Sequence, residues 1–198
     1  MKSQLSKRDA RLEHRRPAGF TLVELLITVV VLSILLGLAV PSFRSLMQND
    51  QQWLQQNNLT LALSAARSEA IKQDVPGGVS VCASTGNGAP PTCDGASWAQ
   101  GWIVVLNGVA GAKPVQVVGA LPTNTTLNEA NGNLSVTFMS NGAINTPLLL
   151  NPAAPVAFKM CDVRGATYAR YSQVSLMGRV VSSPMVGKDL TGAALVCP

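Results

Sequence analysis

The longest apolar segment of the chain runs from Phe20 to Val40 and contains one charged residue, Glu24. As an α-helix it would be about 32 Å long, enough to span a hydrocarbon core about 30 Å thick. Basic residues precede the segment, so the N-terminus is expected in the cytoplasm and the rest of the chain outside. The segment is closed by Pro41 and not by the small residues of a secretory signal. We therefore expect residues 20–40 to be retained as a transmembrane helix.

A helical pattern continues beyond the apolar segment, because residues 42–74 contain no Gly or Pro. Apolar residues recur there with the spacing of one helical stripe: Leu59, Ala62, Leu63, Ala66 and Ala70. A second apolar group lies nearer the membrane: Phe43, Leu46, Met47, Trp53 and Leu54. We expect the later half of this helix, within residues 41–74, to pack on a sheet, and the earlier half to be free to meet neighbouring subunits. Pro76-Gly77-Gly78 should end the helix.

Short β-branched runs follow and predict strands in a globular head over residues 75–198. The expected strands are Val79–Cys82, Trp102–Leu106, Val115–Val118, Leu134–Met139, Val156–Cys161, Tyr171–Leu176 and Arg179–Ser182. Turn signals at Asn107-Gly108, Asn141-Gly142 and Met177-Gly178 favour a meander of antiparallel hairpins. The Asn- and Pro-rich residues 122–133 and 145–155 are expected to be loops. The predicted fold class is α+β, with one long N-terminal helix packed by its second half on an antiparallel β-sheet head.

The chain has a net charge of +5, which by itself suggests an acidic partner. The distribution of this charge along the chain changes that inference. Residues 1–19 contain six basic and two acidic residues, whereas the remaining chain contains nine basic and eight acidic residues. If the N-terminal tail is removed, the general argument for a polyanionic partner is lost, although a local basic patch could remain.

The four cysteines, Cys82, Cys93, Cys161 and Cys197, all lie beyond the apolar segment. They lack C-x-x-C spacing, and the single histidine, His14, is in the basic tail, so disulfides are favoured over a metal site. Cys82 and Cys93 bracket an Asn-, Gly- and Pro-rich loop that a disulfide would restrain. The other two cysteines would then pair with each other, and crossed pairings remain open.

Glu24 is unusual because a carboxylate near the centre of a membrane helix costs about 2.5–3.5 kcal/mol on insertion scales. It could reach toward the membrane surface. Alternatively, cleavage between Gly19 and Phe20 would create an α-amine one helical turn before Glu24, on the same face. That amine could pair with Glu24 of its own chain or of a neighbouring subunit, and an inter-chain pair would align the subunits.

The residues around this position resemble the prepilin peptidase site of type IV pilins and type II secretion pseudopilins. The similar residues are Arg16-Pro17-Ala18-Gly19 and the following Phe20-Thr21-Leu22-Val23-Glu24-Leu25-Leu26. The resemblance implies a leader over residues 1–19 that is cleaved after Gly19, N-methylation of Phe20, and Glu24 as the assembly carboxylate. Pro41 matches the proline at which pilin helices commonly bend or melt.

The same resemblance implies where the protein is and what it meets. It places the chain in the inner membrane with a periplasmic head, and later in a pilus or pseudopilus. Its implied partners are other pilins through the N-terminal helix, the prepilin peptidase and the inner-membrane assembly platform.

The head is similar to the FimT/FimU and GspH group, the H-type minor pilins and pseudopilins. The similar residues are Ala66-Arg67-Ser68-Glu69-Ala70-Ile71-Lys72, Gly101-Trp102-Ile103-Val104, Cys161-Asp162, Val174-Ser175-Leu176-Met177-Gly178-Arg179-Val180 and Cys197. Members of this kind tie a late strand to the C-terminus, which supports a Cys161–Cys197 disulfide. Taken without the resemblance, Arg67 to Glu69 is also explained as a polar, exposed helix edge.

Catalysis is not expected. The only histidine lies in the leader, no Gly-Lys-Ser/Thr ending follows the glycine pairs, and the acids Asp94, Glu129, Asp162 and Asp189 are dispersed. No cofactor or metal is predicted, although calcium bound by loop carbonyls stays open.

The functional prediction is a minor pilin that joins the tip or the initiating complex of a type IV pilus. A type II secretion pseudopilin H is the alternative. A further alternative is a DNA receptor for natural transformation, because some FimT-like proteins are associated with uptake through a Gly-Arg-x-Arg motif. Here Gly178-Arg179-Val180-Val181 lacks the second arginine, so Arg179 and Lys188 are the candidate contacts. Lys159, Arg164 and Arg170 are nearby in sequence, but solvated surface charges are the commoner outcome.

Overall fold

The computed structural model describes residues 19–108 and 114–197. The predicted leader and the peptidase-site residues before Gly19 therefore lie outside the described residues. The chain divides into two compact units, Met1–Ser45 and Leu46–Pro198. Helix α1 (Leu22–Gln73) contributes its first part to one unit and its second part to the other.

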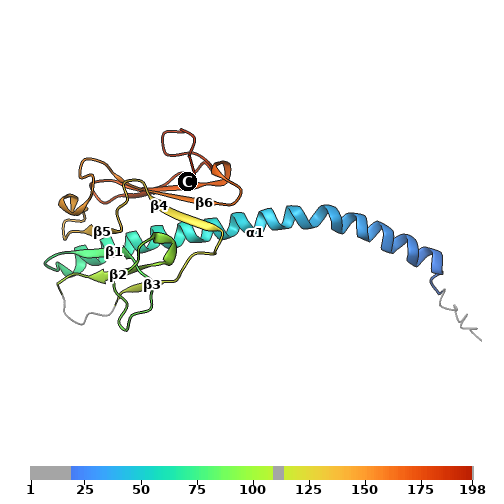
Figure 1. Cartoon of the computed structure of the whole chain (residues 1–198), viewed down its shortest axis with the longest axis horizontal. Coiled ribbons are helices and arrows are strands. Elements are labelled where there is room, and N and C mark those ends of the chain that lie inside the picture. Colours follow the sequence, from blue (N-terminus) through green and yellow to red (C-terminus); the bar gives the residue numbers. More distant parts are fainter. Residues whose placement is uncertain (1–18, 109–113, 198) are drawn as a thin grey trace, which may run out of the picture. The chain divides into compact units, whose positions relative to one another are not determined.

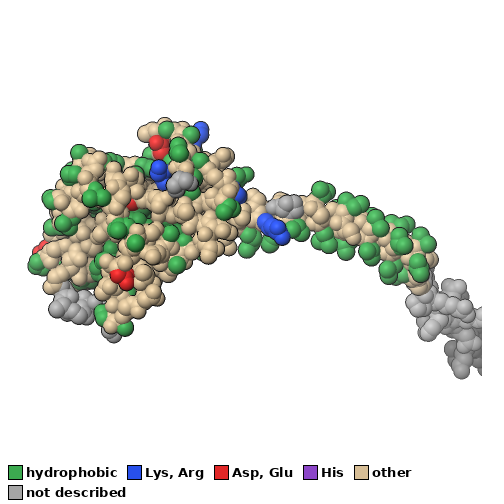
Figure 2. All heavy atoms as spheres, in the orientation of Figure 1, with side chains coloured by type: hydrophobic (Ala, Val, Ile, Leu, Met, Phe, Trp, Pro, Cys, Tyr) green, Lys and Arg blue, Asp and Glu red, His purple; other side chains and the backbone are tan. Residues whose placement is uncertain are grey.

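In the first unit, the described residues form the apolar part of α1. This helix is long and apolar enough to cross a membrane, with an 18-residue window of mean hydropathy 2.7 and none of that window buried in the protein. Figure 2 shows hydrophobic side chains along this part of α1. Its two hydroxyl side chains are satisfied within the helix, because Thr28 donates to the Leu25 carbonyl and Ser33 to the Val29 carbonyl. Glu24 is thus the one residue of the predicted span whose polar group needs an external partner.

The helical assignment of α1 continues through Pro41 without interruption. Proline lacks a backbone N–H, so this position cannot donate a hydrogen bond to the carbonyl four residues earlier. The bend inferred at Pro41 stays a prediction.

In the second unit, α1 packs on the sheets with the predicted stripe of apolar residues. Leu59, Ala62, Leu63, Ala66 and Ala70 are each at most 1% exposed. The helix ends at Gln73, shortly before Pro76-Gly77-Gly78, as expected. The apolar group nearer the membrane is exposed: Phe43, Leu46, Met47, Trp53 and Leu54. The period-3.6 pattern therefore predicted the buried stripe of the helix correctly.

In the described residues, eight strands form two four-stranded antiparallel sheets (Figure 1). The first sheet has the order β3 (Gln116–Val118), β2 (Trp102–Leu106), β1 (Val79–Ala83) and β5 (Ser135–Phe138). The second sheet has the order β4 (Thr125–Glu129), β6 (Val156–Asp162), β7 (Arg170–Val174) and β8 (Val180–Ser182). Three short 3-10 helices lie between strands: η1 (Trp98–Gln100), η2 (Thr146–Leu148) and η3 (Ala166–Tyr168).

Two expectations about the head were wrong. The strands do not form one meander, because β4 leaves the first sheet to pair with β6 while β5 returns to pair with β1. Residues 122–133 are not all loop, since they contain β4. Turn residues specify where the chain reverses but not which strands pair, so local signals favoured neighbouring hairpins. In β4 the buried residues Leu127 and Glu129 alternate with more exposed ones. Because Glu129 is charged, the sequence does not show the apolar–polar alternation that would predict a strand.

The core lies between α1 and the inner faces of both sheets. Trp98 of η1 packs edge-on against Phe158 of β6, with ring centroids 4.9 Å apart and an interplanar angle of 84°. This pair joins a segment flanking the first sheet to the centre of the second. A smaller apolar cluster of Cys161, Ala169 and Leu195 lies apart from the main core and includes part of the C-terminal segment.

Both expected disulfides are present. Cys82 of β1 bonds to Cys93, and Cys161 of β6 bonds to Cys197 near the C-terminus. No cysteine among the described residues is free. The first disulfide closes the loop that follows β1, and the second fastens the C-terminal segment beside the second sheet.

Candidate assembly and binding sites

The N-terminus of α1 has the local geometry of a capped helix. The Thr21 hydroxyl accepts a hydrogen bond of 3.2 Å from the backbone N–H of Glu24. Thr21 is therefore the N-cap residue and Glu24 occupies the third helical position. A carboxylate in the first turn is favoured by the helix dipole. The Thr21-x-x-Glu24 spacing thus serves the helix start in addition to any role in assembly.

The Glu24 carboxylate has no hydrogen-bond or ion-pair partner among residues 19–108 and 114–197. Gly19 and Phe20 precede the first helical residue, and Phe20 is 83% exposed. Gly19 and Phe20, the two residues on either side of the predicted cleavage, are therefore exposed and non-helical. Glu24, whose side chain would attract a new α-amine, therefore has no partner within the described residues.

The exposed apolar face of α1 continues into the head unit. Trp53, Leu54 and Leu61 are 55%, 52% and 62% exposed on the side of the helix away from the buried stripe. Single exposed apolar side chains are common on protein surfaces, whereas larger exposed apolar patches usually mark contacts with other molecules. Here three of them occur close together in the second half of α1, which makes this face a candidate contact with other helices.

Arg67 differs from the expectation of an exposed polar edge. Its guanidinium points into the head and donates hydrogen bonds to the backbone carbonyls of Gly142 and Met177. Ser68 is exposed, and Glu69 pairs with Lys72 at 3.1 Å along the same helix. The hydrogen bond from Gln73 is the main cause that lowers the pKa of Glu69, followed by that from Lys72. The prediction was wrong for Arg67 because its acceptors are carbonyls of distant turns.

The basic residues near the predicted nucleic-acid contacts do not form one free cluster. Arg164 pairs with Asp162 at 2.6 Å, donates to the Asn49 side chain at 2.7 Å and lies 4.3 Å from the centre of the Tyr168 ring. Arg170 is half-buried, and burial, with a smaller contribution from the charge of Arg164, lowers the pKa of its guanidinium. Arg164 thus ties the turn between β6 and β7 to α1 and is committed to the fold.

Arg179 and Lys188, the candidate nucleic-acid contacts, are both exposed. Arg179 immediately precedes β8, and Lys188 lies in the C-terminal segment, where it bridges to Ala194. Neither side chain has a partner in the described part of the chain. Figure 2 shows the Lys and Arg side chains on the visible face of the head as separate spots. The geometry leaves two single cations and no continuous basic stripe.

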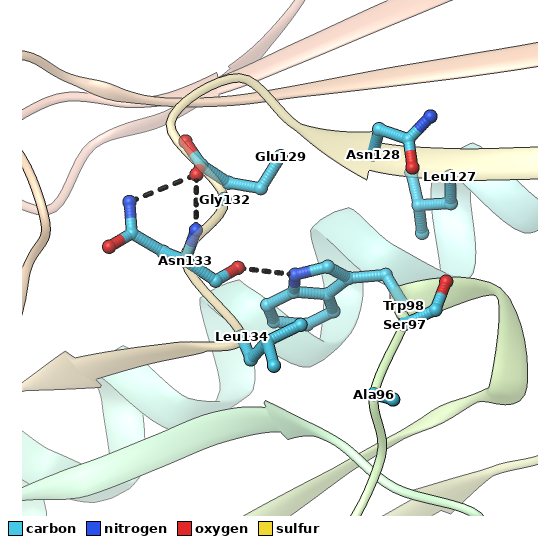
Figure 3. Close-up of a pocket in the computed structure, with 9 residues that line it drawn as sticks. All are labelled: Ala96, Ser97, Trp98, Leu127, Asn128, Glu129, Gly132, Asn133 and Leu134. Atoms are coloured by element: carbon cyan, nitrogen blue, oxygen red, sulfur yellow. Dashed lines mark hydrogen bonds between the residues drawn. The ribbon is translucent and has the colours of Figure 1, made fainter. Parts of the chain in front are cut away.

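A cavity of about 280 Å³ lies between η1, β4 and the loop that leads to β5 (Figure 3). Glu129 is 6% exposed beside it, and its carboxylate accepts hydrogen bonds from the backbone N–H groups of Asn131, Asn133 and Ala157. The Asn133 side-chain amide also donates to Glu129 at 2.9 Å, and Trp98 Nε1 donates to the Asn133 carbonyl at 2.7 Å.

Figure 3 shows the Glu129 carboxylate directed at Asn133, in the loop that leads to β5. Its lone pairs are used by protein N–H groups, so it is suited to organising the loop and not to acid–base chemistry or metal binding. In the described residues, no group of three or more His, Cys, Asp or Glu side chains could hold a metal ion. Sequence reasoning missed this role because Glu129 acts through backbone groups that no motif reveals.

Comparison with protein families now adds to this geometry. The model of the type II transport protein GspH matches residues 55–178, which is more than half of the chain. The model of the prokaryotic N-terminal methylation motif matches residues 14–40. The chain belongs to the GspH family. The matched residues include the second half of α1 and most of both sheets, so the resemblance seen in the sequence is confirmed.

Among solved structures, the chain is similar to the type IV minor pilin FimU of Pseudomonas aeruginosa. One crystal form aligns with a TM-score of 0.53 and 22% identity, covering 69% of this chain and 91% of that chain. A second crystal form gives 0.49 and 23%, covering 65% and 89%. At this identity the first alignment shows a shared fold, the pilin fold. No curated protein sequence matches the chain.

Proposed function

We propose that this member of the GspH family is a minor pilin of a type IV pilus, in the tip or the initiating complex. The observation that carries the proposal is the N-terminal methylation motif on residues 14–40, followed by an apolar helix with one unpartnered carboxylate. A GspH-type head then completes the pilin architecture. The helix would supply assembly contacts and the head would cap or adapt the filament.

Processing would convert the start of the chain into an assembly site. Cleavage after Gly19 by a prepilin peptidase would leave Phe20 with a positive α-amine, which would then be methylated. An amine at the N-terminus of a helix is disfavoured by the helix dipole, so it would benefit from a nearby carboxylate. Glu24 of a neighbouring subunit can supply that carboxylate in an apolar helix bundle, where an unpaired charge is costly.

The exposed side of α1 would provide the remaining contacts with other pilins. Trp53, Leu54 and Leu61 lie outside the core of the head and are available to partner helices. Insertion into the filament by the inner-membrane assembly platform would bring this exposed apolar surface into contact with partner helices. Before that step we place the protein in the inner membrane, with residues 20–40 spanning it and the head in the periplasm.

Mass spectrometry of the N-terminus from the native host tests processing. The expected mature chain begins at a methylated Phe20 and is found both in the inner membrane and in sheared filaments. A chain that retains residues 1–19 in all fractions would contradict the proposal. A chain with a free, processed N-terminus that is secreted and never associated with filaments would contradict it as well.

A second candidate function is a pseudopilin of a type II secretion system, favoured by the matching family model of the type II transport protein GspH. The helix contacts would be the same, and the filament would be a short pseudopilus. The neighbouring genes discriminate between the two, because minor pilin genes indicate a pilus and a secretion operon indicates a pseudopilus.

Binding of DNA is not favoured as the main function. Arg164 is committed to Asp162 and Asn49, which leaves Arg179 and Lys188 as separate exposed cations. Of the net charge of +5, residues 1–19 carry +4, which processing would remove. We also propose no enzymatic role, because the family is one of filament components and the buried Glu129 is held by structural N–H groups.

A further inference from the structure

Arg67 contacts two turns that are far from it, and from each other, in the sequence. Its Nε donates to the Gly142 carbonyl at 2.9 Å, and its Nη2 donates to the Met177 carbonyl at 3.2 Å. Gly142 lies in the turn after β5, at the edge of the first sheet. Met177 lies in the turn between β7 and β8 of the second sheet. One guanidinium on α1 therefore binds one turn from each sheet.

The two turns also touch each other at this point. The backbone N–H of Ile144 donates to the Leu176 carbonyl at 3.1 Å, which links the segments directly. Gly178 and Gly142 have φ angles of +74° and +78°, in the region that favours glycine. A Cβ on Gly178 would collide with the Gly142 carbonyl oxygen, and a Cβ on Gly142 would lie 3.0 Å from Ile71 Cδ1. Both glycines are buried, and the turns close on each other without intervening space.

Arginine is the suitable residue for this position for two physical reasons. Its planar guanidinium presents several donors in a fixed fork, so it can serve two carbonyls at once, whereas lysine is a flexible point charge. Hydrogen bonds from a charged donor are worth about 1.5–3 kcal/mol, more than neutral ones. Arg67 is also anchored between Ala66 and Ala70, which are both fully buried in the main core.

The two sheets have no strand in common and no strand pairing between them. Elsewhere they are joined by apolar contacts, such as Trp98 on Phe158. We propose that Arg67 is the positioning residue of the head: it locks the Gly142 turn and the Met177-Gly178 turn to α1 and thereby sets the relative placement of the two sheets at this end. Met177, 75% exposed, and the exposed Arg179 project from the turn that it holds.

Hydrogen–deuterium exchange on the full-length mature chain in detergent micelles tests the proposal. In Arg67→Met, peptides that contain the Gly142 turn and the Met177-Gly178 turn should both exchange at least about tenfold faster than in the wild type. Peptides from the β1–β2 pair should be unchanged. Lys72→Met is the matched control, because it removes a positive charge one turn later on α1 from a side chain that is 69% exposed.

If Arg67→Met does not fold, Arg67→Lys is used instead, because it keeps the positive charge. One ammonium cannot hold both carbonyls in the same geometry, so at least one turn should exchange faster while the β1–β2 pair is unchanged. Protection of both turns at the wild-type level in Arg67→Lys, or an equal loss over all strands in an Arg67→Met variant that still folds, would overturn the proposal. Exchange reports on the head alone, so the result is independent of whether the protein assembles into a pilus.

Discussion

At the scale of the residue, the side chains that organise the head act on backbone groups. Arg67 binds two backbone carbonyls, and Glu129 accepts from three backbone N–H groups. None of these contacts has a sequence motif, because backbone acceptors and donors are present at every position. Glu24 and Gly19, in contrast, could be identified from the sequence. A charge in an apolar span and a cleavage motif are recognisable without knowledge of the fold.

Glu129→Gln should destabilise the head, because an amide group replaces one carboxylate oxygen and leaves a buried N–H of the loop without its acceptor. We expect the free energy of unfolding to fall by about 1–3 kcal/mol, measured by urea denaturation of the head. Glu69→Gln is the matched control on the surface of α1, where the loss should be below about 0.5 kcal/mol. Equal losses in the two variants would show that burial of Glu129 has no special role.

At the scale of the element, the sequence predicted the helix and most strands but not their pairing. The stripe Leu59 to Ala70 has a clear period of 3.6, and Trp102–Leu106 is a short apolar run rich in β-branched residues; both elements formed where expected. Strand β4 was missed because Glu129 is buried and Asn residues surround it. The separation into two sheets could not be predicted, because it depends on contacts such as Ile144 with Leu176 that join distant segments.

Apart from the Cys161–Cys197 disulfide, the C-terminal segment is held only by a small apolar cluster and a few long-range hydrogen bonds among the described residues. These include Gly187 N–H to the Ala169 carbonyl at 2.7 Å. Replacing both cysteines by alanine should lower the free energy of unfolding by about 4 kcal/mol in the chain-entropy model, against about 3 kcal/mol for Cys82 and Cys93.

Denaturant unfolding measures the free energies of the two double variants, and hydrogen exchange locates the change. The Cys161/Cys197 variant should lose protection mainly over residues 183–197. An unchanged free energy, or loss of protection centred on β1, would contradict this role of the disulfide.

At the scale of the whole molecule, charge and apolar surface are divided between parts of the chain. Residues 1–19 contain a net charge of +4, and the remaining residues contain +1. The long apolar surface belongs to α1, where Phe20 to Val40 is followed by exposed side chains such as Trp53 and Leu61. Such a molecule is suited to helix-mediated assembly and poorly suited to binding a polyanion through its head.

The head, from about residue 48 onward, should bind duplex DNA weakly or not at all at physiological salt. Few phosphate contacts are available, and each depends steeply on salt concentration. A gel-shift assay with the head and with Arg179→Ala measures this. Micromolar or tighter binding by the wild type that is lost in Arg179→Ala would contradict the prediction and favour a DNA receptor.

The central claim is that Glu24 pairs with the new α-amine of Phe20 when the subunit enters a filament. The most direct measurement compares Glu24→Gln with the wild type by quantifying the protein in sheared filaments and in the inner membrane of the native host. Glu69→Gln, the same substitution further along α1, is the control. We predict that Glu24→Gln is inserted and cleaved normally but is at least about tenfold depleted in filaments, because the amine then lacks its counter-charge. Incorporation of Glu24→Gln at the wild-type level would contradict the account.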